Sequence, residues 1–435
     1  MSGTATRLQP IDEAVPGFEE LMGPPVPGPL LAVYDEAGSR LDSVSRIQAT
    51  WYPAKQLTVR YRVSASGGDL PGRRDVVAMI GKLPDGAALV TGEAATVAMW
   101  VVPDDPLLPG LRSALDVATV DDLLAGLGSA SQVVATRLRA YRPGRRAVVE
   151  VMAGRSSLFL KVVPPAEVAS LHARHRFLSD FISVPDSIGV DNRLGIVVMR
   201  ALEGVDLRTV LRDGSAKVPS PDAVAGMIEN LPEPPSSWKT RSPIAALGGI
   251  TELLRRLLPD TTGRIDRLVD DIGEEISGDR VAVHGDFHEA QVIVDAGHPL
   301  ALIDVDTYGW GRRGDDAATM LGHLHLLAPE CRDPAQVIDV ARSLNRYWDE
   351  RIDPVDLRLR TAAVVLGLAT GPFRVQRPNW PAETLARIAV AEQWVESAMR
   401  LDERSLIPTS DVSHVGAAPC ARQVKRPERS DHADT

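Results

Sequence analysis

The spacing of hydrophobic and polar residues changes along the chain from a period of two to a period of 3.6. Up to about residue 205, runs rich in β-branched and aromatic residues are bounded by Gly, Pro and Asp, which is typical of strands joined by turns. Helical patterns lie between and after these runs, so the sequence predicts two β-rich units with accompanying helices. The predicted strands lie at 55–63, 75–83 and 94–102 in the first unit, and at 133–141, 146–153, 157–163 and 195–202 in the second.

From about residue 206 onward the apolar residues recur at helical spacing. In GITELLRRLLPD, residues 249–260, Ile250 and four leucines fall on one face, and the same pattern returns at 334–352, 360–371 and 381–401. The C-terminal half is therefore predicted to be mainly helical, with strands only within 281–306. From Ser405 the periodicity ends and Pro, Ser, Asp and Arg accumulate, which predicts a disordered tail.

Two segments of the β-rich half resemble each other. WYPAKQLTVRY (51–61) and YRPGRRAVVEV (141–151) share an aromatic residue, a proline two positions later, a basic residue two positions after that, and a β-rich run. This pattern predicts a duplicated small β unit. Two unrelated hairpins with ordinary turn chemistry would also produce it.

Composition narrows the class of protein. The chain of 435 residues is 44% hydrophobic and 24% charged, which suits two or three domains with a large core. Since no run of roughly 18 apolar residues and no basic, apolar leader is present, we expect no membrane span and a cytoplasmic location. A net charge of -10 disfavours nucleic acid and anionic membranes as partners. Two cysteines are too few for a disulfide framework, which leaves small-molecule chemistry.

The stretch VHGDFHEAQVIV, residues 283–294, gathers polar residues at the start of a predicted strand. Phosphoryl transfer from ATP needs a carboxylate that accepts a proton, oxygen ligands for Mg²⁺, a cation on the phosphates and a backbone edge for adenine. Asp286 lies in the loop, Gln291 follows five residues later, and Asp304 follows the apolar LALI. A hairpin would bring Gln291 and Asp304 onto adjacent strand ends near Asp286, where oxygens from all three could reach one hard cation.

The series HGDFHEAQVIV, LIDVD and GDDAA resembles the HGDxHxxN, IDxx and GDxxxDxA motifs of the aminoglycoside phosphotransferase and choline kinase family. The resemblance implies a protein-kinase-like fold with Asp286 as catalytic base and Gln291 and Asp304 as Mg²⁺ ligands. It also implies that Asp316 braces the catalytic loop. Most members have Asn where Gln291 stands, and maltokinase-like members share the Gln, which keeps the amide oxygen and adds a methylene.

Lys161 is the predicted phosphate-binding cation. Within LFLKVV, strand alternation places it on one face with Phe159 and Val163, so its charge needs an anion, which the ATP phosphates would supply. Its usual glutamate partner is not evident. Glu167 is close in sequence, but it may precede the helix on which family members place that glutamate.

Three further roles follow from the resemblance. The turn YRPGRR would cover the nucleotide, with Arg145 or Arg146 near phosphate, and the backbone from Met199 to Leu202 would bind adenine as the hinge between two lobes. His284 is expected to hold the catalytic loop through hydrogen bonds. The implied architecture is α+β: a cap domain at 1–125, a β-rich N-lobe at 126–205, a helical C-lobe at 206–404 and a tail at 405–435.

The predicted function is Mg·ATP-dependent transfer of phosphate to a hydroxyl of a small molecule. We expect a sugar, aminosugar or aminoglycoside, because Trp310 and Asp306 follow the metal-binding strand and could offer a flat apolar ring and a carboxylate to such an acceptor. Tryptophans at helical spacing can equally be core residues. The sequence indicates no particular oligomeric state.

Two other classes of function compete with this prediction. A pseudokinase or binding module would keep the fold without turnover, and the missing glutamate partner of Lys161 leaves that alternative open. A non-haem iron site could use His284 and Asp286 with His323 or His325. The helical pattern downstream argues against it, because such sites are usually housed in an all-β double-stranded helix.

Overall fold

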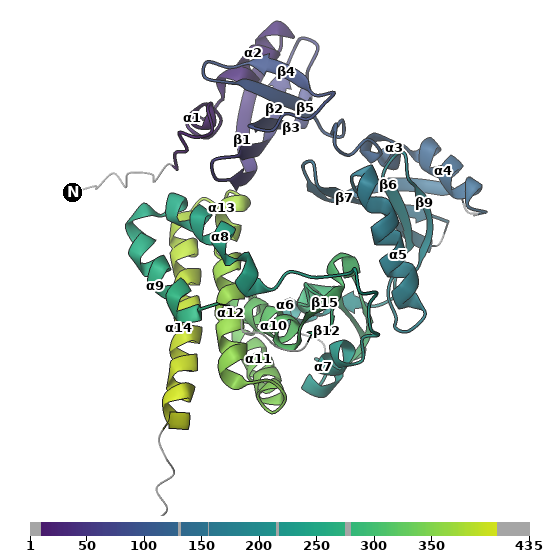
Figure 1. Ribbon diagram of the computed structural model, residues 1–435. Coiled ribbons are helices and arrows are strands. Elements are labelled where there is room, and N and C mark those ends of the chain that lie inside the picture. The colour runs from purple at the N-terminus through teal and green to yellow at the C-terminus, as the bar shows by residue number, and fades with distance from the viewer. Residues whose placement is uncertain (1–9, 129–131, 155, 215–216, 275–279, 407–435) are drawn as a thin grey trace, which may run out of the picture.

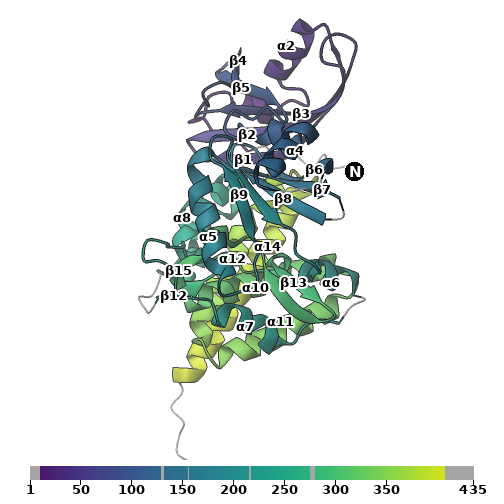
Figure 2. The same ribbon diagram turned by 90° about the vertical axis from the view of Figure 1, so that its right-hand side faces the viewer.

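The computed structural model describes residues 10–128, 132–154, 156–214, 217–274 and 280–406. They form a cap, a β-rich N-lobe and a mainly helical C-lobe, and in both views the cap (purple) and the N-lobe (blue) lie above the C-lobe (Figures 1 and 2). The prediction of a two-lobed α+β fold is confirmed. The domain boundaries near 125 and 205 stay predictions, and 407–435, most of the predicted tail, lies outside the described residues.

The cap is a five-stranded antiparallel sheet with two helices, and its strands pair in the order β1-β2-β3-β5-β4. Successive side chains of a strand point to opposite faces of the sheet, and this gives the sheet one buried face. In β2, Tyr61, Val63 and Ala65 are buried while the residues between them are partly exposed. The elements are α1 (Phe18–Met22), α2 (Gly28–Glu36), β1 (Arg40–Tyr52), β2 (Gln56–Ser66), β3 (Gly72–Ile80), β4 (Ala88–Thr91) and β5 (Thr96–Val101).

The N-lobe is a second five-stranded antiparallel sheet, paired in the order β6-β7-β8-β10-β9. Two short helices precede it, and one helix connects its third and fourth strands along the chain. The elements are α3 (Leu111–Leu115), α4 (Val117–Gly126), β6 (Val133–Arg142), β7 (Arg146–Ala153), β8 (Ser156–Val162), η1 (Pro165–Glu167), α5 (Val168–Ser179), β9 (Ser187–Asp191) and β10 (Ile196–Arg200).

The two sheets share strand order and the register of their first hairpin. Tyr52 pairs with Gln56 in the cap and Arg142 with Arg146 in the N-lobe, and in each turn the middle residue is left-handed, with φ 57° at Ala54 and 65° at Gly144. When the strand pairings are followed from these turns, the position of Lys161 in the N-lobe corresponds to the buried Met79 in the cap. The cap therefore lacks the cation that the N-lobe presents at this position.

The C-lobe carries the remaining helices around two small sheets, β11-β13-β14 and β12-β15. Side-chain caps begin several helices, for example Ser242 before α8 and Asp353 before α12. Its strands and short 3₁₀ turns are β11 (Val205–Asp206), β12 (Arg280–Val283), β13 (Val292–Asp295), β14 (His298–Leu302), β15 (Gly309–Arg312), η2 (Pro259–Thr261), η3 (Glu289–Gln291), η4 (Val305–Thr307) and η5 (Ala328–Glu330). Its helices are α6 (Leu207–Asp213), α7 (Pro221–Glu229), α8 (Pro243–Leu257), α9 (Thr262–Ile272), α10 (Arg313–Leu327), α11 (Pro334–Asp349), α12 (Pro354–Leu368), α13 (Gly371–Arg374) and α14 (Trp380–Leu406). None of the described helices is long and apolar enough to cross a membrane.

An aromatic series joins the cap to the C-lobe. Phe18 and Trp51 of the cap lie 4.6 Å apart between ring centroids, Trp51 lies 6.3 Å from Phe373 of α13, and Phe373 lies 5.2 Å from Trp380. These rings belong to one hydrophobic core that runs from the cap sheet into α8, α12 and α14. The cap therefore packs directly against the helix pair α13–α14.

Asp12 supports the same junction through three contacts. Its side chain is buried and accepts the indole N–H of Trp51 at 2.9 Å, the backbone N–H of Ala54 at 2.8 Å and Nη1 of Arg256 at 3.0 Å. Each of these donors would lose an acceptor if the carboxylate were removed.

We expect Asp12→Ala to lower the thermal unfolding midpoint, because a buried donor left unsatisfied costs roughly 1–3 kcal/mol. Asp339→Ala is the matched control, since its carboxylate is 74% exposed and pairs with an exposed Arg342. Exposed pairs of this kind contribute at most about 1 kcal/mol. Scanning calorimetry of both variants measures the difference, and equal midpoints would contradict this role for Asp12.

Candidate active site

Asp316 of α10 holds the loop 284–291, which joins β12 to β13. Its two carboxylate oxygens accept the backbone N–H groups of His284, at 2.6 Å, and Gly285, at 2.8 Å. Gly285 has φ +83°, and a Cβ there would lie 2.8 Å from the Thr307 carbonyl oxygen, so the turn requires glycine. Burial raises the pKa of Asp316 to about 7, although the two N–H groups lower it.

His284 fixes the same loop from its inner side. Its Nδ1 accepts the backbone N–H of Asp286 at 3.3 Å, so the ring proton belongs on Nε2, which donates to the Ile303 carbonyl at 3.0 Å. Burial lowers the pKa of the ring and favours this neutral form. These are the contacts that a loop-holding residue requires.

An ion cluster joins the two lobes beside this loop. Lys161 of β8 contacts Asp304 at 2.6 Å and Asp306 at 2.5 Å, and Arg146 of β7 contacts the same carboxylates at 3.1 and 3.3 Å. The Lys161 side chain is 5% exposed, so its ammonium group depends on these carboxylates for compensation of its charge. Burial would raise the pKa of Asp304, but Lys161 and Arg146 hold it well below its ordinary value. Within the described chain Lys161 pairs with these aspartates and makes no ion pair with Glu167.

Asp286 lies close to this cluster with its carboxylate accessible. Burial, followed by the charge of Asp304, raises the pKa of Asp286 to about 6, against the lowering effect of Arg146 and Arg142. The side chain is 46% exposed and makes no hydrogen bond to another described side chain; Nε2 of His288 lies 4.0 Å away. A hydroxyl group could therefore approach this carboxylate.

Gln291 and His288 form a coupled pair at the end of the loop. The backbone N–H of Ala290 donates to Nδ1 of His288 at 3.2 Å, so the neutral ring carries its proton on Nε2. That Nε2 lies 3.1 Å from the side-chain nitrogen of Gln291. Because two donors cannot bond each other, we assign the amide in the reversed orientation, with its oxygen facing the ring. The backbone N–H of Ile303 bonds the Gln291 carbonyl at 2.9 Å, which places Gln291 and Asp304 at neighbouring strand ends.

The structure gathers most, but not all, of the predicted site residues. Arg145 donates to the hydroxyl of Tyr52 at 2.9 Å, so its neighbour Arg146 is the turn arginine at the ion cluster. Met199 is buried in β10 opposite Phe159, and Leu202 follows in the connection toward β11.

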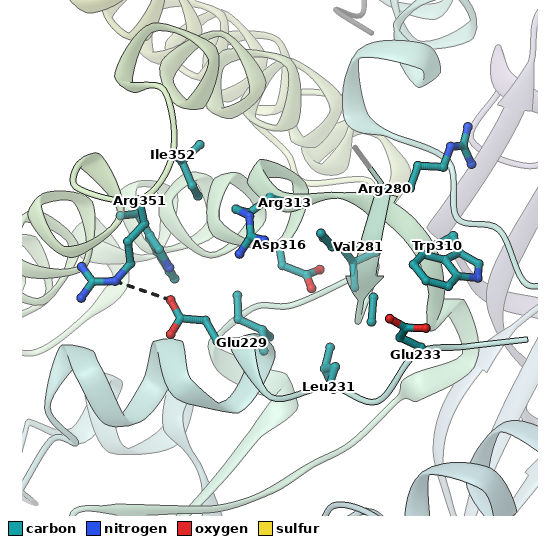
Figure 3. A pocket seen from close by; sticks show the side chains of 14 residues that line it. Glu229, Leu231, Glu233, Arg280, Val281, Trp310, Arg313, Asp316, Arg351 and Ile352 are labelled. Carbon is teal, nitrogen blue, oxygen red and sulfur yellow. Dashed lines mark ion pairs between the residues drawn. The ribbon is translucent and has the colours of Figure 1, made fainter. Parts of the chain in front are cut away.

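Trp310 lines a cavity that is separate from the site of Asp286. That cavity, of about 240 Å³, is also lined by Glu233, Arg280 and Asp316 (Figure 3). No described residue of its lining is Asp286, Gln291 or Asp304. The structure therefore does not bring Trp310 together with the proposed base.

A second cavity, of about 310 Å³, is formed by C-lobe residues, none of which is Asp286, Gln291 or Asp304, and we call it the arginine pocket. His323 of α10 lines it, and the ring nitrogens of His323 and His288 and the carboxylate of Asp286 all lie within 4.8 Å of one another. Two glutamates, Glu289 and Glu330, line the pocket together with five arginines, which are Arg208, Arg212, Arg374, Arg377 and Arg387.

Sequence reasoning missed this pocket. Glu289 lies inside the quoted motif, and it is buried with a carboxylate oxygen 2.7 Å from Arg208. The motif shows the glutamate, but only the structure shows its burial and its partner. Arg374 and Arg387 belong to helices about a hundred residues downstream, and no local pattern links them to the motif.

The iron site considered from the sequence is not assembled around His284, although Asp286 and His323 lie within 4.8 Å of each other and of His288. His284 turns toward the Ile303 carbonyl, and His325 packs edge-on against Trp394 with ring centroids 6.0 Å apart. The fold also lacks the double-stranded β-helix in its described residues, because each of its sheets is small and flanked by helices.

Comparison with known proteins identifies the class. Residues 137–352 match the model of the phosphotransferase enzyme family. This part, just under half of the chain, is similar to that family. The match confirms the resemblance drawn from the motifs and the prediction of a small-molecule kinase. No curated protein matches the sequence.

Solved structures resemble this phosphotransferase weakly. Macrolide 2'-phosphotransferase MphH from Brachybacterium faecium is 16% identical with a TM-score of 0.41, and the alignment covers 63% of this chain and 97% of that one. A thermostable mutant of aminoglycoside phosphotransferase APH(4)-Ia, in ternary complex with ADP and hygromycin B, is 15% identical with a TM-score of 0.42, covering 65% and 98%. Similarities of this size support no conclusion about the substrate.

We expect Asp316→Asn to lower kcat about tenfold or more, because the substitution replaces one of the two accepting oxygens with an NH₂ group, which cannot accept the backbone N–H that faces it. A resulting shift of about 1 Å at a catalytic group is costly. Circular dichroism should show an intact fold. Asp339→Asn serves as the exposed control. An unchanged kcat in Asp316→Asn would show that the loop does not depend on this brace.

Proposed function

We propose that this phosphotransferase moves the γ-phosphate of ATP to a hydroxyl group of a small molecule. The observation that supports this most directly is the proximity of Asp286 to the ion cluster of Lys161, Arg146, Asp304 and Asp306. Such a junction offers a proton acceptor, cations for phosphate and oxygen ligands for a metal in one place, which are the requirements of phosphoryl transfer.

In the proposed reaction Asp286 accepts the proton of the acceptor hydroxyl while that oxygen forms a bond to the γ-phosphorus. The bond from this phosphorus to the bridging oxygen breaks, and ADP leaves with the electron pair. Lys161 and Arg146 stabilise the negative charge on the phosphates. A pKa of about 6 suits Asp286 as a base near neutral pH. No covalent enzyme intermediate is required.

The donor atoms fit a magnesium ion. Asp304 offers carboxylate oxygens and Gln291 offers an amide oxygen, which are the hard ligands that Mg²⁺ prefers. When bound, the ion would neutralise charge on the phosphates. His288 orients the Gln291 amide, whose oxygen keeps a second lone pair for the cation.

We assign the backbone from Met199 to Leu202 to adenine, because it leaves β10 at the passage between the two lobes. Arg146 takes the role of the turn arginine near phosphate, since Arg145 is engaged with Tyr52. His284 and Asp316 hold the loop that carries the base.

The acceptor is proposed to be a polyhydroxylated ring. The expected classes were a sugar, an aminosugar or an aminoglycoside, with Asp306 and Trp310 as contacts. Because Asp306 pairs with Lys161 and Arg146, and Trp310 lies at the other cavity, we assign the acceptor instead to the arginine pocket beside Asp286. The alternative is a pseudokinase that binds nucleotide without turnover.

Asp286→Asn separates these possibilities. It keeps the side-chain shape and removes the proton acceptor, so ATP affinity should persist while kcat falls by a factor of about 10² or more. Asp304→Ala should weaken Mg·ATP binding as well. Calorimetric titration with Mg·ATP and a coupled assay for ADP measure the two effects. A wild-type protein that binds Mg·ATP and forms no ADP with any hydroxyl compound would favour the pseudokinase.

The reaction should also depend on pH. Because burial and Asp304 raise the pKa of Asp286 to about 6, the ionised base is lost as the pH falls through that value. We expect kcat/KM to be flat above about pH 7 and to fall about tenfold per pH unit well below 6. A rate profile without a break between pH 5 and 7 would speak against Asp286 as the base.

A further inference from the structure

The arginine pocket carries information about the acceptor, and the inference drawn from it rests on the proposed function. Its volume of about 310 Å³ is at the low end of the roughly 300–1,000 Å³ range of ligand pockets. His323 brings its wall within 4.8 Å of the Asp286 carboxylate. A single sugar ring seated there could present a hydroxyl to the base.

The charge of the pocket is strongly positive. Five arginines line it against two glutamates, and burial lowers the pKa of His323 to about 4, so that ring is neutral. Arg208 pairs with Glu289 at 2.7 Å, and Arg212 and Arg377 share Glu330 at 2.6 and 3.1 Å. These pairs account for three of the arginines.

The two remaining arginines have no carboxylate partner among the described residues. Arg387 donates to the Leu368 carbonyl at 2.7 Å and makes no ion pair with a described residue. The Arg374 side chain makes neither a hydrogen bond nor an ion pair with a described residue. Burial lowers the pKa of both guanidinium groups, and neighbouring arginines lower it further, whereas Asp286 raises the pKa of Arg374 and Glu330 and Glu383 raise that of Arg387. An anion placed between them would relieve this repulsion.

The fold holds these two arginines in place. A Cβ at Gly371 would lie 3.0 Å from Nη1 of Arg387, so the glycine leaves room for the guanidinium. Arg374 follows Phe373, which is buried against Trp51 of the cap and Trp380 of α14. The positive groups therefore sit on packed helices.

The opposite wall of the pocket suits hydroxyl groups. Glu289 is 1% exposed, and its Oε1 accepts from Arg208. Its Oε2 is buried without a hydrogen-bond partner, and Nδ1 of His288 and Nδ1 of His323 each lie 3.8 Å from it. A buried carboxylate oxygen of this kind can accept a hydrogen bond from a ligand hydroxyl. Leu326, Pro372 and Val375 add apolar surface for a ring face.

We propose that the acceptor is a monosaccharide-sized polyol that carries an anionic group, a carboxylate or a phosphate, bound by Arg374 and Arg387, with Glu289 receiving a hydroxyl. Amine-bearing acceptors are disfavoured, because their cations would lie next to the two arginines that have no carboxylate partner among the described residues. Since Arg374 also lies close to Asp286, Arg145 and Arg146, it could contact the transferred phosphate as well. Arg387 therefore provides the cleaner test.

The experiment uses the full chain and four matched probes: glucose, glucosamine, glucuronate and glucose 6-phosphate. We expect kcat/KM to be at least tenfold higher for one of the anionic probes than for glucose, and lowest for glucosamine. The two anionic probes distinguish carboxylate from phosphate recognition. Preference for glucose or glucosamine would overturn the inference and leave the kinase assignment intact.

Arg387→Ala should raise KM for the anionic probe about tenfold or more while KM for ATP changes less than twofold. Arg387→Lys should restore part of the affinity, because the charge returns without the planar fork. Arg342→Ala, at an exposed arginine that is 69% accessible, is the control and should match the wild type. Equal losses for glucose and the anionic probe in Arg387→Ala would contradict anion recognition.

Binding without turnover separates failure of this inference from failure of the proposed function. Calorimetric titration of Asp286→Asn with the four probes, in the presence of Mg·ATP, measures affinity where no reaction occurs. Binding of an anionic probe that is lost when Arg387→Ala is added would uphold the pocket even if the wild type transferred no phosphate. If neither anionic probe binds, the inference is wrong.

Discussion

The buried charge of Lys161 is the constraint around which the two lobes are arranged. An ammonium group that is 5% exposed is costly unless anions surround it, and the N-lobe sheet offers it none in the described chain. Asp304 and Asp306 of the C-lobe supply the anions, and Arg146 completes the cluster. The same requirement that fastens the lobes therefore places the cations proposed for phosphate and the oxygens proposed for magnesium at one junction, next to the accessible carboxylate of Asp286.

The cap contributes to the site through packing. Its sheet repeats the strand order and turn register of the N-lobe, yet the position of Lys161 is taken by Met79, so the cap presents no equivalent cation. Phe18 of the cap packs against Trp51, and Trp51 packs against Phe373, which precedes Arg374 in the lining of the arginine pocket. The cap thus fixes a wall of the proposed acceptor site from a distance.

Local sequence rules predicted a structural feature correctly where one short segment of the chain contains all of its residues. The loop 284–291 showed its base, its histidines and its glycine turn as neighbours, and the hairpin that follows brings Gln291 and Asp304 together as expected. Those rules could not choose between Arg145 and Arg146, because a three-residue turn decides which side chain faces the cluster and which reaches Tyr52. They also placed Trp310 near the acceptor, although β15 directs it to another cavity.

The sequence by itself determined the spacing of hydrophobic residues in each half of the chain, and hence the two-lobed α+β fold. It also determined the motifs that are typical of a phosphotransferase. The hydrophobic spacing and the motifs both depend on residues that are close together in the chain. Only the tertiary structure decided the partners of Lys161 and the character of the acceptor pocket. Lys161 meets Asp304 from 143 residues away, and Glu289, Arg374 and Arg387 converge from separate helices and loops. Such contacts arise from how packed elements cross, and no local pattern of residues encodes that crossing.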